Sequence, residues 1–171
     1  MDKKMFCFQC EQTVGCTGCT GNAGVCGKKA DTAKLQDELT GALIGLARAV
    51  DDTAAISKRT GQVIIEGLFT TVTNVSFDDA AIENMIQKVR AEKERLVPDC
   101  RTEEYDLQQL WNANEDIRSL KSLILFGIRG MAAYAYHANV LNYEDAKVNL
   151  FFCEALFKIG YEESVERLLP T

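Results

Sequence analysis

The sequence predicts an all-α protein, a helical bundle of about five to six helices that follows a cysteine-rich N-terminal loop. Three observations predict this fold. Apolar residues recur at intervals of three and four over most of the chain after residue 28. The 171 residues include only two prolines, Pro98 and Pro170, so long stretches are free to form helices. No segment sustains the apolar–polar alternation of a strand.

The chain divides into two parts by composition. Residues 1–28 hold five of the seven cysteines, are rich in glycine and show no helical or strand periodicity. Residues 29–171 carry the helical pattern. Because a length of 171 residues is typical of one domain, we expect a cysteine-rich loop over 1–28 and a helical bundle over 29–171 that together form that domain.

The first half of the bundle is expected to contain three helices. The first begins near Lys29 and ends between Thr53 and Lys58. The second spans residues 61–74, and the third begins at an N-cap, either Ser76 or Asp78, and ends at Pro98. The apolar face of the first helix consists of Leu35, Leu39, Leu43, Leu46 and Val50.

Two glycines, Gly41 and Gly45, lie four residues apart on the first expected helix. A spacing of four places them on one face of the helix. Each glycine costs up to about 1 kcal/mol of helix propensity relative to alanine. We therefore expect another segment of backbone to pack closely against this face.

The second half begins with a segment, residues 101–113, that is expected to be a linker with some apolar residues in the core. A long helix then starts at the N-cap Asn114, because Glu115 and Asp116 suit the positive end of the helix dipole. One face of this helix is expected to carry Ile117, Leu120, Ile124, Ile128, Met131 and Ala135.

Two further helices complete the expected bundle. One opens at Asn142 or Tyr143 and stops at Gly160, and the last covers residues 162–169. The last helix stops directly after an apolar face has begun at Val165, so we expect the core to be incomplete. Its exposed apolar surface would allow the chain to form a homo-oligomer.

Charge and hydropathy exclude two classes of partner. Nineteen basic residues against twenty-five acidic ones give a net charge of −6, which argues against nucleic-acid binding because phosphates need clustered cations. After residue 30, the longest uncharged stretch, Gly130–Tyr143, is shorter than the roughly 20 residues that span a bilayer. The N-terminus shows no signal-peptide pattern. We expect a cytoplasmic protein without membrane partners whose cysteines are thiols.

The cysteines indicate a metal centre. Thiolates bind iron and zinc, and a Cys-x-x-Cys pair supplies two ligands to one site. Spacing allows two ligand sets that share Cys7, Cys10 and Cys19 and add either Cys16 or Cys26. Neighbouring phenylalanines and glycines favour an iron–sulfur cluster, because backbone amides can then donate to its sulfurs in an apolar shell. A structural zinc module that has no redox role remains the alternative.

Other chemically reactive residues are expected to be structural. His137, the only histidine, should pack within its helix, and Tyr134 and Tyr136 should pack as well. Cys100 and Cys153 have no partners at metal-ligand spacing, and Cys153 lies among apolar residues as a small core residue would.

Seven short segments carry a resemblance to a known family. They are MFCFQCEQT at 5–13, TGCT at 17–20, GVCGK at 24–28, DTAKLQD at 31–37, GLFTTVTN at 67–74, NEDIRSLK at 114–121 and GMAAYAYHA at 130–138. Together they resemble the hybrid cluster proteins, also called prismane proteins or hydroxylamine reductases. The resemblance covers nearly the whole chain and includes the cysteine loop and the long helix after Asn114.

The resemblance implies a cofactor and its ligands. The cysteines that match the family's cluster ligands are Cys7, Cys10, Cys19 and Cys26, and the short gap between the second and third is similar to the type that carries a 4Fe-4S cubane. Cys16 departs from the family pattern. The short segment between Leu96 and Asn114 is similar to a compact subclass.

The resemblance also implies that electron transfer and catalysis take place in different domains. In the family, hydroxylamine is reduced to ammonia, or nitric oxide to nitrous oxide, at a hybrid Fe–S–O cluster whose ligands come from later domains. Those ligands do not occur in this sequence, so it is expected to be an N-terminal electron-transfer domain with no catalytic residues. Its expected partners are the remaining domains of the hybrid cluster protein and an electron-donating reductase.

Overall fold

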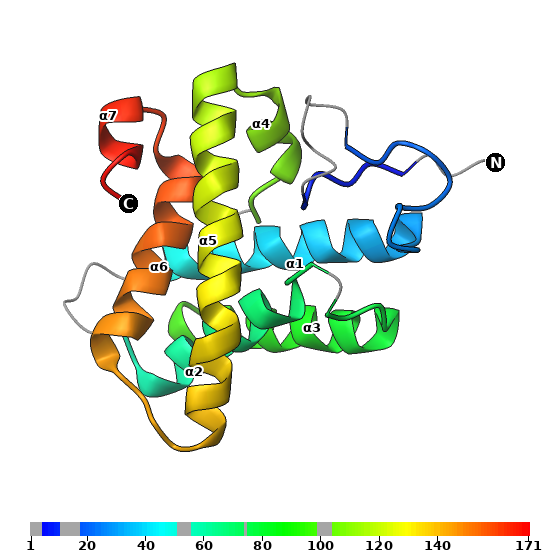
Figure 1. Cartoon of the computed structure of the whole chain (residues 1–171). Coiled ribbons are helices and arrows are strands. Elements are labelled where there is room, and N and C mark those ends of the chain that lie inside the picture. Colours follow the sequence, from blue (N-terminus) through cyan, green and yellow to red (C-terminus); the bar gives the residue numbers. More distant parts are fainter. Residues whose placement is uncertain (1–4, 11–17, 51–55, 74, 99–103) are drawn as a thin grey trace.

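The computed structural model describes residues 5–10, 18–50, 56–73, 75–98 and 104–171. These residues form seven helices and no sheet, which confirms the all-α prediction (Figure 1). The helices are α1 (Ala30–Ala49), α2 (Lys58–Thr70), α3 (Asp79–Leu96), α4 (Leu107–Asn112), α5 (Glu115–Val140), α6 (Ala146–Tyr161) and α7 (Val165–Leu168). The helix that was not expected is the short α4, which lies in the segment interpreted as a linker.

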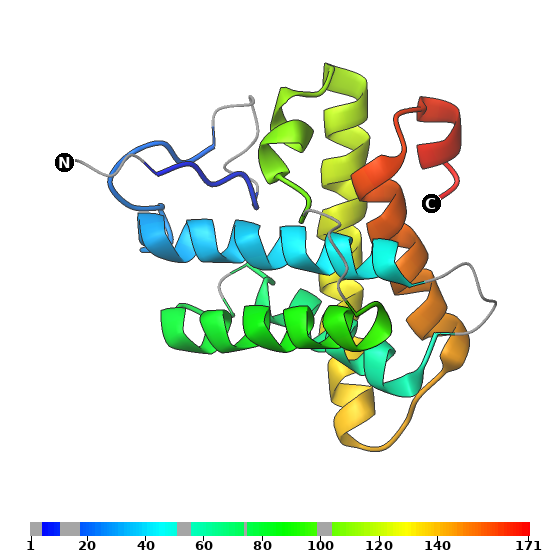
Figure 2. The same ribbon diagram turned by 180° about the vertical axis from the view of Figure 1, so that it is seen from behind.

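Helix α1 lies at the centre of the bundle and forms the base of the N-terminal loop. Figures 1 and 2 show α1 beside α3, with α5 and α6 running across α1 and the N-terminal loop over the first half of α1, next to α4. The expected apolar face of α1 is buried, with Leu39, Leu43 and Leu46 fully inaccessible to solvent. They pack in one core with Ile64 and other apolar residues of the remaining long helices.

Capping side chains set where the helices begin. The Ser57 hydroxyl accepts a hydrogen bond from the Thr60 amide, so α2 starts at Lys58 and not at Gly61 as expected. The expected caps Asp78 and Asn114 are confirmed. Helix α6 begins after the cap Asp145, whose carboxylate accepts a hydrogen bond from the Lys147 amide, so the expected start at Asn142 or Tyr143 is wrong.

Helix ends also differ from the expected boundaries. Helix α1 ends at Ala49, before the expected region 53–58, and α2 ends at Thr70, where the Thr71 amide donates to the carbonyls of Gly67 and Leu68. Helix α3 ends at Leu96, before Pro98, as expected because proline disfavours a helical residue before it.

Most of the expected inward face of α5 is confirmed. Ile117 and Ile128 are buried and Ile124 and Ala135 pack against the core, whereas Met131 is 47% exposed. Arg129 also lies inside and donates to the hydroxyls of Thr40 and Thr71. The apolar residues Leu123 and Phe126 of the same helix are exposed. No helix within the described ranges is long and apolar enough to cross a membrane.

Candidate metal centre

The four cysteines that the resemblance singled out lie around one cavity. Its volume is about 210 Å³, and it is formed by the N-terminal loop together with one residue of the α2–α3 connection. The lining residues are Met5, Cys7, Gln9, Cys10, Cys19, Gly24, Val25, Cys26, Lys28 and Thr73. All four cysteines are free thiols. Cys16, on which the alternative ligand set depends, and Cys100 lie outside the described residues.

Backbone hydrogen bonds hold the loop in shape around this cavity. Cys7 and Cys19 form an isolated antiparallel bridge, in which the Cys7 amide donates to the Cys19 carbonyl at 3.0 Å and the Cys19 amide donates to the Cys7 carbonyl at 2.9 Å. The bridge needs glycine beside it, because Gly18 has φ +58° and a Cβ there would lie 2.8 Å from the Cys7 carbonyl oxygen. The glycines of this loop therefore allow two cysteine-bearing segments to approach each other.

The cavity has an apolar side and an exposed side. Met5 is buried against Ala30 and Ala33 at the start of α1. Phe6 and Phe8 pack on Trp111 of α4, with ring-centroid distances of 5.8 and 5.1 Å. Cys7, Cys10 and Cys19 are half-buried, whereas Cys26 is exposed.

Lys28 forms the buried floor of the cavity. Its side chain is among the largest fully buried ones, with 1% of its surface exposed. The ammonium group donates to the side-chain oxygens of Gln9 at 3.0 Å and Gln36 at 2.5 Å, and lies 3.9 Å from the Cys7 sulfur. Burial raises the pKa of Cys7, while the positive charge of Lys28 lowers it.

A second layer of polar residues lies behind Lys28. The Gln9 amide group donates to the Asp37 carboxylate at 3.4 Å. Burial raises the pKa of Asp37 to about 6, against the opposing effects of Arg129, Gln9 and Lys28. Burial also lowers the pKa of Arg129 to about 10, while Asp37 and Cys7 raise it. The side of the site that faces the bundle thus holds two buried cations.

The four cysteines are suitable ligands for an iron–sulfur cluster. Each cysteine of a 4Fe-4S cluster binds a different iron, so the sulfurs surround a space, and these four cysteines lie around one cavity. Among the described residues, no three His, Cys, Asp or Glu side chains come together in a group that could hold one metal ion. Lys28 adds a buried positive charge to the wall, which suits an anionic occupant.

Sequence reasoning found the cysteines and missed the polar residues behind them. Lys28, Gln9 and Gln36 were visible only as parts of family-like segments, because their contact with one another depends on tertiary folding. Cys153 is buried in the core, as expected, with its thiol 3.9 Å from the Ala47 carbonyl oxygen.

Two of the aromatic residues near the C-terminal end of α5, Tyr136 and His137, pack against other rings. His137 packs its ring edge against Phe69 and Tyr136, at 5.7 Å from each ring centroid. Tyr136 stacks on Phe69 at 4.5 Å. The expectation that Tyr134 packs is wrong, because 84% of its surface is exposed, although it lines the cavity described next.

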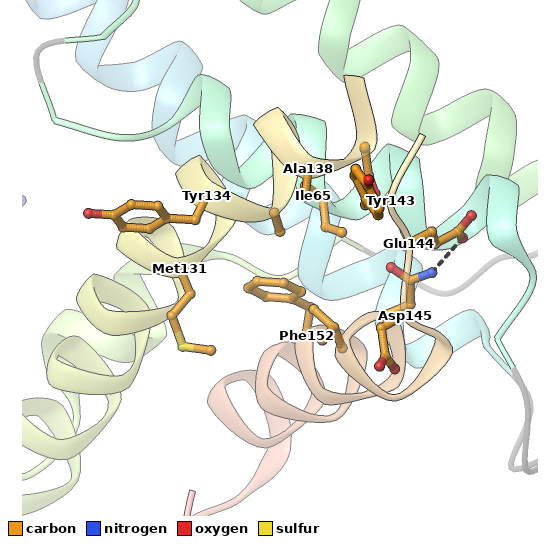
Figure 3. A pocket seen from close by; sticks show the side chains of 12 residues that line it. Ile65, Met131, Tyr134, Ala138, Tyr143, Glu144, Asp145 and Phe152 are labelled. Carbon is orange, nitrogen blue, oxygen red and sulfur yellow. Dashed lines mark hydrogen bonds between the residues drawn. The ribbon is translucent and has the colours of Figure 1, made fainter. Parts of the chain in front are cut away.

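A larger cavity between α5 and α6 offers no comparable chemistry. It has a volume of about 470 Å³ and mostly apolar walls that include Ile65, Met131 and Phe152 (Figure 3). Its carboxylates already have partners. Glu144 accepts a hydrogen bond from Asn149 at 2.8 Å and pairs with Lys58, and Asp145 caps α6. The residues that line this cavity include no cysteine or histidine.

Comparisons with known proteins agree with the resemblance found in the sequence. The model of the Prismane/CO dehydrogenase family matches residues 5–169. The hydroxylamine reductase of Thermodesulfovibrio yellowstonii is 41% identical over 89% of this chain and 33% of its own length. Those of Methanococcus vannielii and Clostridium perfringens are 39% and 36% identical, each over 91% of this chain and 33% of their own length. The chain thus spans about a third of the length of these relatives.

Proposed function

Because the chain belongs to the Prismane/CO dehydrogenase family, we propose that it binds a 4Fe-4S cluster and transfers electrons through it. The proposed ligands are Cys7, Cys10, Cys19 and Cys26. The observation that carries the proposal is that these four cysteines line one cavity. When bound, the cluster would accept and release one electron at a time.

The surroundings of the cysteines support a redox role over a purely structural one. Three of the proposed ligands are half-buried, and the buried Met5 lines the same cavity. Both features limit solvent access, which is one of the factors that set a cluster's potential. Cys26 is exposed, so an electron donor can approach the site from outside the protein. We assign the electron donor to an external reductase that contacts the loop around Cys26.

The proposed destination of the electrons is based on the relatives. The three relatives compared are hydroxylamine reductases about three times as long as this chain. We propose that the electrons serve hydroxylamine reduction, or nitric oxide reduction, at a hybrid Fe–S–O cluster held by further domains. The apolar residues exposed on α5, such as Leu123 and Phe126, would contact those domains or a second copy of the chain.

The test is chemical analysis of the protein prepared without oxygen. We expect iron and acid-labile sulfide in equal amounts, four of each per chain, and a brown visible absorption that bleaches on reduction and returns on reoxidation by an electron acceptor. A colourless protein with one zinc and no sulfide would instead establish the structural zinc module. A cluster that cannot be reduced and reoxidised would leave binding intact and refute electron transfer.

A further inference from the structure

We propose that Lys28 is a positioning residue of the cysteine site, which holds Cys7 in place and raises the reduction potential of the bound cluster through its buried positive charge. This inference rests on the proposed function. Lys28 is not itself a ligand, because an ammonium group has no lone pair to offer a metal. Its effect is exerted through Cys7 and through its charge.

The geometry holds the Lys28 ammonium in a defined place. Its two amide partners come from different parts of the fold, since Gln9 lies in the loop and Gln36 on α1. Gln36 is itself anchored, because its amide nitrogen donates to the Ser76 carbonyl at 3.0 Å. The Gln9 carbonyl accepts a hydrogen bond from the Thr73 hydroxyl at 2.9 Å. The ammonium therefore sits at a junction between the loop, α1 and the α2–α3 connection, beside the Cys7 sulfur.

The contacts of Lys28 are unusual for a buried cation. Its hydrogen-bond acceptors within the described residues are two neutral amide oxygens and the sulfur of Cys7. Buried ammonium groups are costly unless an opposite charge lies nearby. Asp37 is the nearby carboxylate, and its pKa is about 6. Arg129 also acts on this carboxyl group, so the single negative charge of Asp37 is shared between two buried cations, Lys28 and Arg129.

An iron–sulfur cluster would supply the missing negative charge. Four thiolates outweigh the positive charge of the cubane core in both oxidation states, so the site is anionic when it is filled. The reduced cluster carries one more negative charge than the oxidised one. A fixed cation beside it stabilises the reduced form more, and little solvent is present to screen this attraction. Lys28 should therefore raise the potential.

The chain provides a matched control for this charge. Lys29 is the next residue, is exposed and loses the same single charge when it is replaced by methionine. Methionine fills a space similar to that of the lysine stem and is tolerated in cores. The experiment compares the wild-type protein with Lys28→Met and Lys29→Met, each loaded with cluster, by anaerobic redox titration followed by electron paramagnetic resonance of the reduced cluster.

We expect Lys28→Met to reduce the equilibrium constant for cluster reduction at least tenfold, which is about 59 mV for a one-electron couple. Lys29→Met should leave the potential close to that of the wild type. Lys28→Arg, which keeps the charge, should recover most of the wild-type potential. Equal potentials in the wild type and Lys28→Met would overturn the inference while leaving the proposed function intact, since the cluster would still be present.

Two further outcomes have defined meanings. If Lys28→Met fails to fold by circular dichroism, Lys28→Gln replaces it, because its amide can still donate to the two glutamine oxygens. If the neutral variants lose the cluster while Lys28→Arg and Lys29→Met keep it, the charge is needed to assemble the site, and the inference stands. Loss of the cluster from Lys28→Arg as well would show that the shape of lysine matters and not its charge. Absence of a cluster in the wild type would refute the proposed function itself.

Discussion

The carbonyl oxygen of Tyr105 lies against Gly41 so closely that a Cβ on Gly41 would be 2.3 Å from it. The Tyr105 amide also donates to the Gly41 carbonyl at 3.4 Å. The segment that leads into α4 is therefore laid directly on the backbone of α1, as the spacing of Gly41 and Gly45 predicted. Because the atoms nearest to Gly41 belong to the backbone of Tyr105, no side chain could move aside to make room for a Cβ. Glycine is therefore required at this position for steric reasons.

Replacing Gly41 with alanine should lower the free energy of unfolding by roughly 1–3 kcal/mol, the usual cost of forcing an extra methyl group into a packed site. The matched control is Gly127→Ala on α5, because a Cβ there would have no atom within 4 Å. That variant should gain about 0.5–1 kcal/mol from better helix propensity. Denaturant unfolding of both variants measures the contrast. Equal effects would contradict the packing argument.

The carboxylate of Glu92 joins three cationic or polar partners at the α2–α3 contact. It is 1% exposed, accepts from the Thr60 hydroxyl at 2.7 Å and pairs with Arg59 at 2.8 Å and Arg95 at 2.7 Å. Hydrogen bonds from Arg95 are the main reason that its pKa lies below the ordinary value. The Glu92 carboxylate is therefore a buried anion whose two oxygens both have hydrogen-bond or ion-pair partners.

The variant Glu92→Gln keeps the shape of the side chain and turns one acceptor into a donor that faces the arginines. We expect a loss of about 1–3 kcal/mol in unfolding free energy, because a buried polar group is left poorly paired. Glu83→Gln on the exposed face of the same helix removes the same charge and should change stability by no more than about 0.5 kcal/mol. Thermal and denaturant unfolding would show the difference. A loss in both variants would point to net charge as the cause.

Periodicity predicted which long segments are helical, but it placed the starts of α2 and α6 wrongly. The apolar pattern of α2 becomes visible at Gly61, yet the helix starts at Lys58 because the Ser57 side chain caps it. Asn142 resembles a cap in the sequence, but its φ of +62° places it in the turn between α5 and α6, and Asp145 is the cap. Short α4 escaped detection because six residues are too few for a period of 3.6 to show.

The candidate site was predictable only for residues whose chemistry is revealed by spacing. The cysteines of a Cys-x-x-Cys pair, three positions apart, can be recognised from sequence alone because few structural roles need that pattern. Arg129 donates to Thr40, which lies 89 residues away in the sequence, and no local pattern indicates such a contact. The burial of Arg129 is set by these contacts across the fold, and the periodic pattern of apolar residues does not reveal it.

The raised pKa of Asp37 predicts a specific dependence of stability on pH in the cluster-free protein. Its pKa is about 6 in the folded chain, against an ordinary value of 3.8. Between these values the folded state holds a proton that the unfolded state has released. The stability that Asp37 contributes is thus complete below about pH 4 and is lost as the pH rises through 6.

The variant Asp37→Asn stays neutral at every pH and isolates this effect. Relative to it, the wild type should lose roughly 2–3 kcal/mol of unfolding free energy between pH 4 and pH 7. Urea unfolding at pH 4, 5, 6 and 7 measures the difference, and Asp116→Asn at the exposed start of α5 is the control for losing a surface carboxylate. A difference between wild type and Asp37→Asn that stays constant with pH would show that Asp37 does not hold the proton.

The choice between Cys26 and Cys16 as the fourth ligand makes the sharpest prediction about the site. Cys26 lines the cavity with the other three cysteines, whereas Cys16 lies outside the described residues. The Lys28 carbonyl accepts a hydrogen bond from the Gly24 amide at 2.8 Å, which closes a turn around Cys26. That turn joins Cys26 to the buried floor of the site, so the ligand and Lys28 are positioned together.

Replacing Cys26 with serine should abolish cluster binding, because a hydroxyl is a much poorer ligand for iron than a thiolate. Replacing Cys16 with serine should leave most of the cluster in place, and Cys153→Ala in the core serves as the control for losing a thiol remote from the site. Iron and sulfide per chain, with visible absorption, measure the result. Retention of the cluster in Cys26→Ser together with its loss in Cys16→Ser would make Cys16 and Cys19 the second ligand pair, and the cavity around Cys26 would then not be the cluster site.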